Sequence, residues 1–398
     1  MNPWLSFGGG LLGLWLILFP YFNTNDLICG VLLLVLFALR RNPSVLISWC
    51  YAAIGFWLGL APLVFWEKNP AIYFNDTIVG ALVLALFVRM PAMPHAAEDT
   101  GPAIPPGFTY NPSSWPQRLP IALLAFVGWM LSRYMAAYQL GYIDTVWDPF
   151  FVNPSLPYAD ETLDVITSKV AKSFPIPDAG LGAFAYSLEM ISAFKGSTRR
   201  WRTEPWMVIL FGLLAVPLSI TSVILIILQP LMVGAWCSLC LFTAFCMLIV
   251  IALSLDEVVA VCKYLRSREK PFFQLLFQGG NCSGAKEDHK TPPLTEPLWT
   301  LLKASFWGVT IRWNLVVCAL SGIWFMSFPA ISDLGPLLIK ADHFFGALII
   351  ATSIISMADV AHKLRYINIL FVALLLIPGV AAPAHWALAL FVAIVTCF

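Results

Sequence analysis

Residues 205–254 read PWMVILFGLLAVPLSITSVILIILQPLMVGAWCSLCLFTAFCMLIVIALS and contain no charged side chain. A helix needs about 20 apolar residues to cross the hydrocarbon core of a bilayer. The stretch can therefore form two spanning helices, one on each side of Pro230. Over the whole chain of 398 residues, 60% are hydrophobic and 11% are charged, whereas about a quarter of the residues in soluble domains are charged. The sequence predicts an all-α integral membrane protein.

Apolar runs of spanning length recur along the chain. We expect about twelve transmembrane helices, at 4–22, 26–40, 45–65, 76–90, 119–142, 176–194, 205–228, 230–254, 312–330, 341–358, 364–380 and 384–398. The first lacks a basic leading segment and a small-residue cleavage site, so we expect a spanning helix rather than a signal peptide.

Two long polar stretches, the Pro-rich 91–117 and the mixed-charge 264–310, are expected to be cytoplasmic linkers. They divide the chain into a first membrane block (1–90), a central four-helix domain (118–263) and a last membrane block (311–398).

Basic residues fall mainly on one side of this twelve-helix arrangement, which should be the cytoplasmic side. They are Arg40, Arg41, Arg89, Arg118, Lys195, Arg199, Arg200, Arg202, Lys263, Arg266, Arg268, Lys270, Lys363 and Arg365. We therefore expect a multi-pass protein of a bacterial cytoplasmic membrane, with both termini in the cytoplasm. The net charge of +1 argues against a nucleic-acid partner, which would favour a basic surface.

A repeat with the spacing G-x-W-x4-P followed by D-x3-G occurs three times in the outer blocks. The copies contain Gly13, Trp15, Pro20, Asp26 and Gly30; Gly55, Trp57, Pro62, Asp76 and Gly80; and Gly322, Trp324, Pro329, Asp342 and Gly346. Trp and Pro suit a membrane anchor and a helix stop, and Gly permits close helix contact. We expect the Asp to cap the second helix of each pair; an ion path is the alternative.

This pattern resembles the SPW repeat, a two-helix membrane unit. Asn2-Pro3-Trp4 stands at the place of its Ser-Pro-Trp, and Arg312-Trp313 in the third copy departs further from it. A fourth helix pair at 364–398 no longer shows the repeat pattern. The resemblance implies architecture only.

The segment Trp236-Cys237-Ser238-Leu239-Cys240 carries the reactive side chains. Two thiols three residues apart lie on one face of a helix, close enough for a disulfide. A place in the first two turns of the helix at 230–254 favours the thiolate, and an outer location permits disulfide chemistry. The spacing alone fits a redox pair, a structural disulfide, two apolar fillers or half of a zinc site, which would need two more ligands.

Residues 118–262 resemble the vitamin K epoxide reductase family. They share its order of a helix, an outer segment with a short helix, and three further helices, the last beginning with C-x-x-C. Pro177, Gly182 and Tyr186 match its P-x4-G-x3-Y pattern. The resemblance implies a quinone-dependent thiol oxidoreductase, in which Cys237 exchanges with outer-side thiols and Cys240 faces a membrane quinone, menaquinone or ubiquinone.

The same resemblance implies a quinone pocket that is lined by Ser168, Asp178, Tyr186 and Trp236, with Phe174 beside them. Electrons would come from a thiol protein or a small thiol on the outer side, and membrane lipid would surround the helices.

The sequence departs from the family in the outer loop. Family members usually carry a second cysteine pair there, but no cysteine occurs from Tyr51 to Trp236, and the loop holds Asp144 and Asp148. Position 244, where some members have a quinone-binding tyrosine, is Ala244. Either a thiol substrate reaches Cys237 directly, or the domain has lost thiol oxidation and the chain is a non-enzymatic membrane scaffold. A transporter is a third hypothesis.

Arg133 stands inside the predicted helix 119–142. A charged residue within a membrane is often functional, but Arg133 could equally extend outward or pair with an outer acid.

Overall fold

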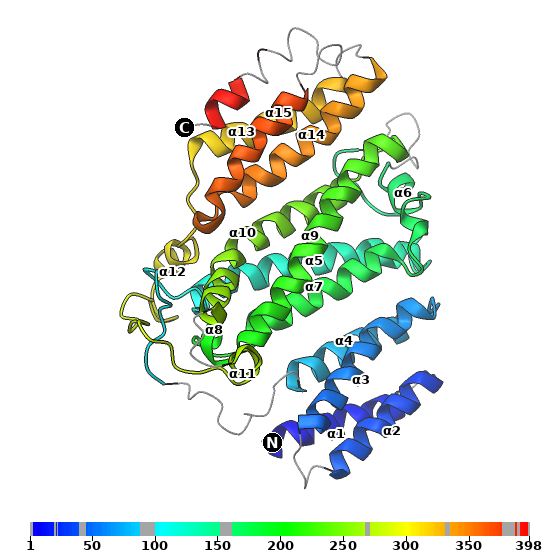
Figure 1. The fold of residues 1–398 in the computed structure, drawn as a ribbon. Coiled ribbons are helices and arrows are strands. Elements are labelled where there is room, and N and C mark those ends of the chain that lie inside the picture. Colours follow the sequence, from blue (N-terminus) through cyan, green and yellow to red (C-terminus); the bar gives the residue numbers. More distant parts are fainter. Residues whose placement is uncertain are drawn as a thin grey trace.

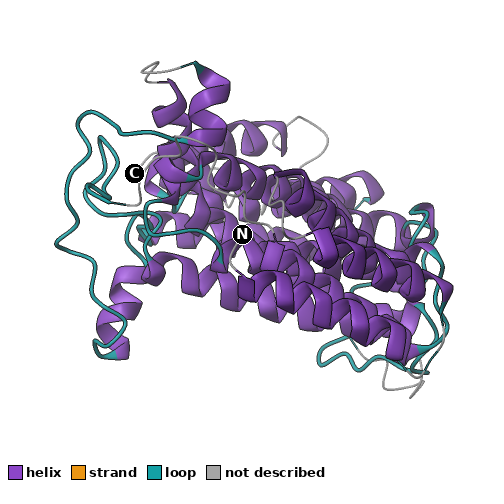
Figure 2. Cartoon of the chain, turned by 90° about the horizontal axis from the view of Figure 1, so that it is seen from below, coloured by secondary structure: helices purple, strands orange, loops and turns teal. Residues whose placement is uncertain are grey.

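The computed structural model describes residues 3–19, 21, 23–39, 45–87, 100–151, 161–266, 271–330, 335–375, 387 and 391–396. Within these ranges the regular structure is helical, apart from two isolated β-bridges that join Ile104 to Lys286 and Val309 to Ala358. The long helices run side by side, and most loops lie at the two ends of the helix bundle (Figure 2). Together with the composition, this arrangement makes the chain a multi-pass membrane protein.

Seven of the described helices are long and apolar enough to cross a membrane. They are α3 (Val45–Val64), α4 (Pro70–Phe87), α5 (Trp115–Gln139), α9 (Pro205–Leu228), α10 (Ser238–Arg266), α14 (Pro336–Ile355), and α13 (Trp313–Ser327) together with the turn that extends it to Ala330. Two further apolar helices, α1 (Pro3–Leu18) and α2 (Thr24–Ala38), are shorter. The predicted number of about twelve spans is therefore not confirmed, and most of the predicted helix 384–398 lies outside the described residues.

Three groups of helices lie next to one another (Figure 1). The central group consists of α5, α7 (Asp178–Phe194), α9 and α10. The first group, α1 to α4, contacts α7 through α3 and α4, and the last group, α13, α14 and α15 (Ile367–Leu375), contacts α9 and α10 through α14. The short helices α8 (Arg200–Thr203), α11 (Phe272–Gln278) and α12 (Leu298–Ser305) lie at one end of the central group, and α6 (Glu161–Ile166) lies at the other.

The repeat glycines meet in pairs at the helix crossings. A Cβ atom added to Gly55 would lie 2.9 Å from the backbone oxygen of Gly80, and one added to Gly80 would lie 2.7 Å from that of Gly55. Gly13 meets Gly30, and Gly322 meets Gly346, in the same reciprocal way. Backbone contact this close leaves no room for a side chain, so each crossing requires glycine on both helices.

We expect Gly80→Ala to destabilise the first helix group by about 1–3 kcal/mol, because the new methyl group must push two backbones apart. Thermal unfolding of the detergent-solubilised protein would measure the loss. Gly212→Ala is the matched control, since a Cβ atom there first meets the Val258 side chain, at 3.3 Å. Equal unfolding temperatures for the two variants would contradict the assigned role of the glycine contact.

The repeat aspartates do not cap their helices, so the expectation of a cap was wrong. Asn23 caps α2 by accepting a hydrogen bond from the Asn25 amide at 3.0 Å. Asp76 and Asp342 lie inside α4 and α14, because these helices begin at Pro70 and Pro336 instead of at 76 and 341. Proline is favoured in the first turn of a helix, so both helices begin earlier in the chain than predicted. The aspartate side chains are buried.

Two tryptophan–asparagine hydrogen bonds join the helix pairs of the first group. The Trp15 indole donates to Asn75 Oδ1, and the Trp57 indole donates to Asn25 Oδ1, each at 2.8 Å. The two repeats therefore contact each other reciprocally: the tryptophan of each one binds the asparagine that precedes the aspartate of the other.

Arg133 joins the first group to the central group. Its guanidinium donates to Thr77 Oγ1 at 2.9 Å and lies 4.9 Å from the ring centres of Tyr73 and Trp129 and 5.1 Å from that of Phe74. The part of the chain that the structure describes contains no ion pair between Arg133 and an acid. Contacts with aromatic ring faces and a hydroxyl group, rather than an outer carboxylate, accommodate this charge.

The two stretches predicted as linkers pack against the α8 end of the central group where the structure describes them. The Trp201 indole donates to the Ala103 carbonyl at 2.7 Å, and Ser113 donates to Glu257 at 2.5 Å. Ile104 of the first stretch pairs with Lys286 of the second. Glu257, which Ser113 contacts, also forms a buried ion pair with Arg200 at 2.5 Å.

Candidate active site at the Cys237–Cys240 disulfide

The connection from α9 to α10 places the two cysteines at a helix start. Beyond Leu228 the chain continues as a π-helical turn, Gln229–Val233, and then leaves the helix at Gly234, whose φ is +77°. Glycine adopts this left-handed conformation without steric cost. α10 therefore begins at Ser238, not at 230 as predicted. Cys237 directly precedes the helix, and Cys240 lies in its first turn.

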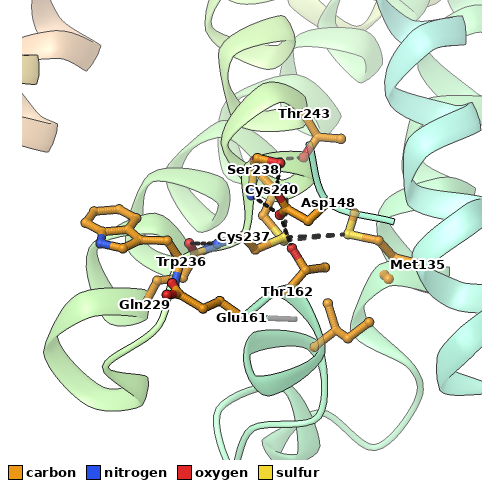
Figure 3. Close-up of a disulfide and its surroundings, with 12 residues drawn as sticks. Met135, Asp148, Glu161, Thr162, Gln229, Trp236, Cys237, Ser238, Cys240 and Thr243 are labelled. Carbon is orange, nitrogen blue, oxygen red and sulfur yellow. Dashed lines mark hydrogen bonds between the residues drawn. A yellow bond between two sulfur atoms is a disulfide. The ribbon is translucent and has the colours of Figure 1, made fainter. Parts of the chain in front are cut away.

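Cys237 and Cys240 form a disulfide, with their Cα atoms 5.3 Å apart (Figure 3). The Cys240 amide donates to Cys237 Sγ at 3.0 Å. The Met135 sulfur of α5 lies 3.6 Å from Cys240 Sγ and 4.0 Å from Cys237 Sγ. Cys237 is 0% exposed, whereas Cys240 is half-buried. An amide donor at the start of a helix favours a thiolate on Cys237 once the disulfide is reduced.

Three side chains from different segments accept hydrogen bonds from the successive amides at this helix start (Figure 3). Glu161 Oε2 accepts from Trp236 at 3.0 Å, and Gln229 Oε1 accepts from Cys237 at 3.1 Å. Asp148 accepts from the Ser238 amide at 2.9 Å and from the Ser238 hydroxyl at 2.6 Å. These bonds satisfy amides that an unassisted helix start leaves free, and they fix the position of the dithiol segment.

Asp148 is the most connected of the three acceptors and is 1% exposed. It also accepts hydrogen bonds from Thr162 and from the Phe150 and Phe151 amides. Burial raises the pKa of its carboxyl group, but the hydrogen bonds outweigh burial and lower the pKa to about 2. Asp148 is therefore a carboxylate at neutral pH. It binds the cysteine segment from a loop that contains no cysteine, and it cannot carry electrons.

We expect Asp148→Asn to destabilise the protein by an amount that depends on pH. Because the folded state holds the pKa of Asp148 below its ordinary value of 3.8, the stabilisation is fully present above about pH 4 and is lost as the pH falls toward 2. Unfolding temperatures of wild type and variant should differ by a constant amount between about pH 7 and 5 and converge below about pH 4. Asp144→Asn, in the same loop but exposed, should show no such difference.

A cavity of about 140 Å³ lies beside the disulfide between α5, α7, α9 and α10. Cys240, Ser168, Asp178 and Tyr186, together with Phe174, contribute to its lining. Most of its wall is apolar and comes from residues such as Met135, Val165, Leu218, Leu225, Ile226 and Ala244. A largely apolar cavity with a few polar groups is typical of a site for a small organic ligand.

Trp236 lies outside this cavity, although it was predicted to line it. Its ring centre is 6.3 Å from that of Phe151 and 5.5 Å from that of His343 on α14. The backbone bonds of Trp236 and Cys237 to Glu161 and Gln229 place its ring toward the last helix group. The structure therefore brings together four of the five residues that the resemblance implied.

The polar groups of the cavity wall are themselves positioned by hydrogen bonds. The Tyr186 hydroxyl donates to the Thr243 carbonyl at 2.9 Å, and Asp178 accepts from Gln139 at 2.5 Å. Ser168 Oγ accepts from the Ala171 amide at 3.2 Å. These bonds give the polar groups defined orientations around the space beside Cys240. In the described ranges no group of three or more His, Cys, Asp or Glu side chains could hold a metal ion.

Comparison with known families agrees with this geometry. Residues 119–255 match the Vitamin K epoxide reductase family. This part of the chain is a domain of that family. The vitamin K epoxide reductase domain includes most of α5, all of α6 to α9 and most of α10, so both the disulfide and the cavity belong to it. No curated protein and no solved structure matches the chain. The SPW-like character of the outer helix groups stays a prediction.

Sequence reasoning missed the residues that position the vitamin K epoxide reductase site. The sequence places Asp148 in the loop without cysteines but assigns it no role, and it does not distinguish Glu161, Gln229 or Met135 from other side chains. One general rule does predict a residue such as Asp148: the free amides at a buried helix start need a hydrogen-bond acceptor. The sequence does not show which distant acidic residue meets that need.

Proposed function

We propose that this protein is a membrane thiol–quinone oxidoreductase. The observation that carries the proposal is that Cys240, one half of a disulfide, lines an apolar cavity inside a vitamin K epoxide reductase domain. Members of this family use quinones, and the cavity offers a ring-sized apolar space beside a reactive sulfur. The quinone would be menaquinone or ubiquinone, both of which the apolar lining suits.

The reaction has two halves that balance. A donor thiolate attacks the disulfide sulfur of Cys237 and a second donor thiol releases the resulting mixed disulfide, so the donor is oxidised and the pair becomes a dithiol. The two cysteine thiols then lose their protons, the electron pair of the Cys240 sulfur passes to the quinone as the S–S bond to Cys237 forms again, and the quinone takes up two protons to become the quinol. Cys237 and Cys240 are the proposed catalytic residues.

The donor must reach a buried sulfur. Cys237 is covered by the loop that carries Asp148 and by α6, which begins with Glu161. Since this loop has no cysteine, an outer-side thiol protein or a small thiol would attack Cys237 directly, after the loop moves away from Ser238. The hydrogen bonds of Asp148 therefore set how often the disulfide is open to its donor.

The same proposal includes the orientation of the chain in the membrane. The disulfide end would face the outside of the membrane, and the α8 end, with Arg199, Arg200 and Arg202, would face the cytoplasm together with both termini. The outer helix groups would be SPW-like repeats that surround the redox domain.

Selective alkylation tests the proposal without a mutation. The oxidised protein is first treated with iodoacetamide, which should modify the exposed Cys262 but not the disulfide. A second sample is reduced with a dithiol before the same treatment. Both are then assayed for quinol formation with dithiol as the donor and a short-chain ubiquinone or menaquinone as the acceptor. The first sample should turn over and the second should not.

Two outcomes would overturn the oxidoreductase function. One is the absence of quinol formation by folded, untreated protein above the uncatalysed rate; the other is equal rates in the two alkylated samples. Either would favour the non-enzymatic scaffold, for which the burial of Cys237 and the absence of loop cysteines are the supporting observations.

A further inference from the structure

Glu189 is a buried carboxyl group that the proposed redox steps do not use. It lies on α7 and is 0% exposed. Neither side-chain oxygen has a hydrogen-bond partner within the described part of the chain. A carboxylate in this position would be a charge without a counter-ion inside a membrane bundle, which is strongly unfavourable. The group is therefore held as the neutral acid, with its proton attached.

The position of Glu189 relates it to the quinone cavity. Residues three or four apart share a face of a helix, so Glu189 lies on the same face of α7 as Tyr186 and Ala193. Tyr186 lines the cavity, and both Tyr186 and Ala193 belong to the core of the central group with Ala215 and Met247. Glu189 follows Tyr186 by about 4.5 Å along the helix axis, just beyond the cavity in the direction away from the disulfide.

Charged groups lie at the end of the bundle beyond Glu189, on the side away from the disulfide. Arg118 donates to the carbonyls of Ala193, Lys195 and Gly196 at the end of α7, at 2.7, 2.5 and 3.1 Å. The Arg200–Glu257 pair lies at the same end of the bundle, because Arg200 also donates to the Lys195 carbonyl at 2.8 Å. Tyr186 on α7 interacts electrostatically with Glu189 and also with Cys246 on α10. Glu189 is thus an acidic group between the cavity and the α8 end.

We propose that Glu189 supplies protons to the reduced quinone and is reprotonated from the α8 side of the membrane. This inference rests on the proposed thiol–quinone function. In each turnover the donor thiols release two protons at the disulfide end, two electrons pass through the Cys237–Cys240 pair, and the quinone takes two protons from Glu189, one after the other. Electrons and protons therefore enter the quinone from opposite sides of the membrane, and turnover moves charge across it.

Proteoliposomes with a pH-sensitive dye trapped in the lumen test this route. The donor is a dithiol peptide that cannot cross the bilayer, so only molecules whose disulfide end faces outward turn over. A short-chain quinone is dissolved in the bilayer, and valinomycin with potassium prevents a membrane potential. Wild type should remove two protons from the lumen for each quinol formed. Glu189→Gln should lower kcat on the order of a hundredfold, with little change in the KM for quinone, and Glu189→Asp should restore part of the rate.

Asp76→Asn is the matched control, because it also removes a buried membrane carboxyl group but in the first helix group; it should keep the wild-type rate and proton uptake. Quinol formation without a change in lumen pH would overturn the inference and leave the redox function intact. A Glu189→Gln variant with wild-type rate and uptake would also overturn it. If Glu189→Gln does not fold, the inference is tested by the number of protons that wild type takes from the lumen for each quinol and by the rate of Glu189→Asp, which should lie below that of wild type. No quinol formation by wild type would instead remove the redox function on which the inference rests.

Discussion

Cys240→Ser should lower quinol formation with a dithiol donor to the uncatalysed rate, a loss on the order of a thousandfold or more. Cys240 is the sulfur that reaches the cavity, and serine neither forms a disulfide nor gives an electron pair to a quinone at neutral pH. Cys237→Ser should cause an equal loss, because the electron pair has no second sulfur with which to form the S–S bond. Because the two residues act as one unit, the double variant should be no worse than either single variant.

The control for this prediction is Cys246→Ser, which replaces a buried free cysteine two turns farther along α10. It should retain the wild-type rate, because Cys246 takes no part in the disulfide. Quinol formation is followed by absorbance, and folding is checked by monodispersity. Substantial turnover by the Cys240→Ser variant would show that quinone reduction does not run through this pair.

Gly182→Leu should raise the KM for quinone roughly tenfold or more, since it places a side chain where the quinone ring would lie. Gly182 lines the cavity, and a Cβ atom there would first meet Ser132 Oγ at 3.5 Å, an ordinary contact. A leucine therefore has room to extend into the cavity without moving a backbone. The measurement is quinol formation as a function of quinone concentration.

The first half of the reaction should survive this substitution. Reduction of the Cys237–Cys240 disulfide by a dithiol, followed by alkylation of the freed thiols, should proceed at the wild-type rate in Gly182→Leu. Gly182→Ala is the control for quinone binding and should change the KM little, because a methyl group fills only a small part of the space. A wild-type KM in the leucine variant would place the quinone elsewhere.

The membrane class and the central domain could be predicted because they depend on local sequence. Long uncharged runs predicted α9 and α10, and the spacing of Pro177, Gly182 and Tyr186 with C-x-x-C predicted the domain that residues 119–255 match. Helix ends were less predictable. Pro230 suggested a boundary, but the chain continues as a π-helical turn and breaks only at Gly234. Pro70 and Pro336 begin helices that hydropathy alone would start later.

The site was only partly predictable because its support comes from distant segments. The cysteine pair and the cavity residues Ser168, Asp178 and Tyr186 lie within the family pattern. Asp148 instead meets Ser238 across ninety residues of chain, and nothing in the local sequence of either residue specifies that contact. The same holds for Arg133, whose aromatic partners Tyr73 and Phe74 belong to a different helix group.

The pairing of Ile104 with Lys286 has a consequence for biosynthesis. Both residues lie between membrane blocks, one before the redox domain and one after it. The ribosome therefore completes all four helices of that domain before the second residue of the pair exists. Until residue 286 has been made, the segment around Ala103 and Ser113 can bind the α8 end but lacks its neighbour. The packing of these two segments on the α8 end is thus completed only after the redox domain has been synthesised, and a gene fragment that stops at α10 encodes that domain without the second segment.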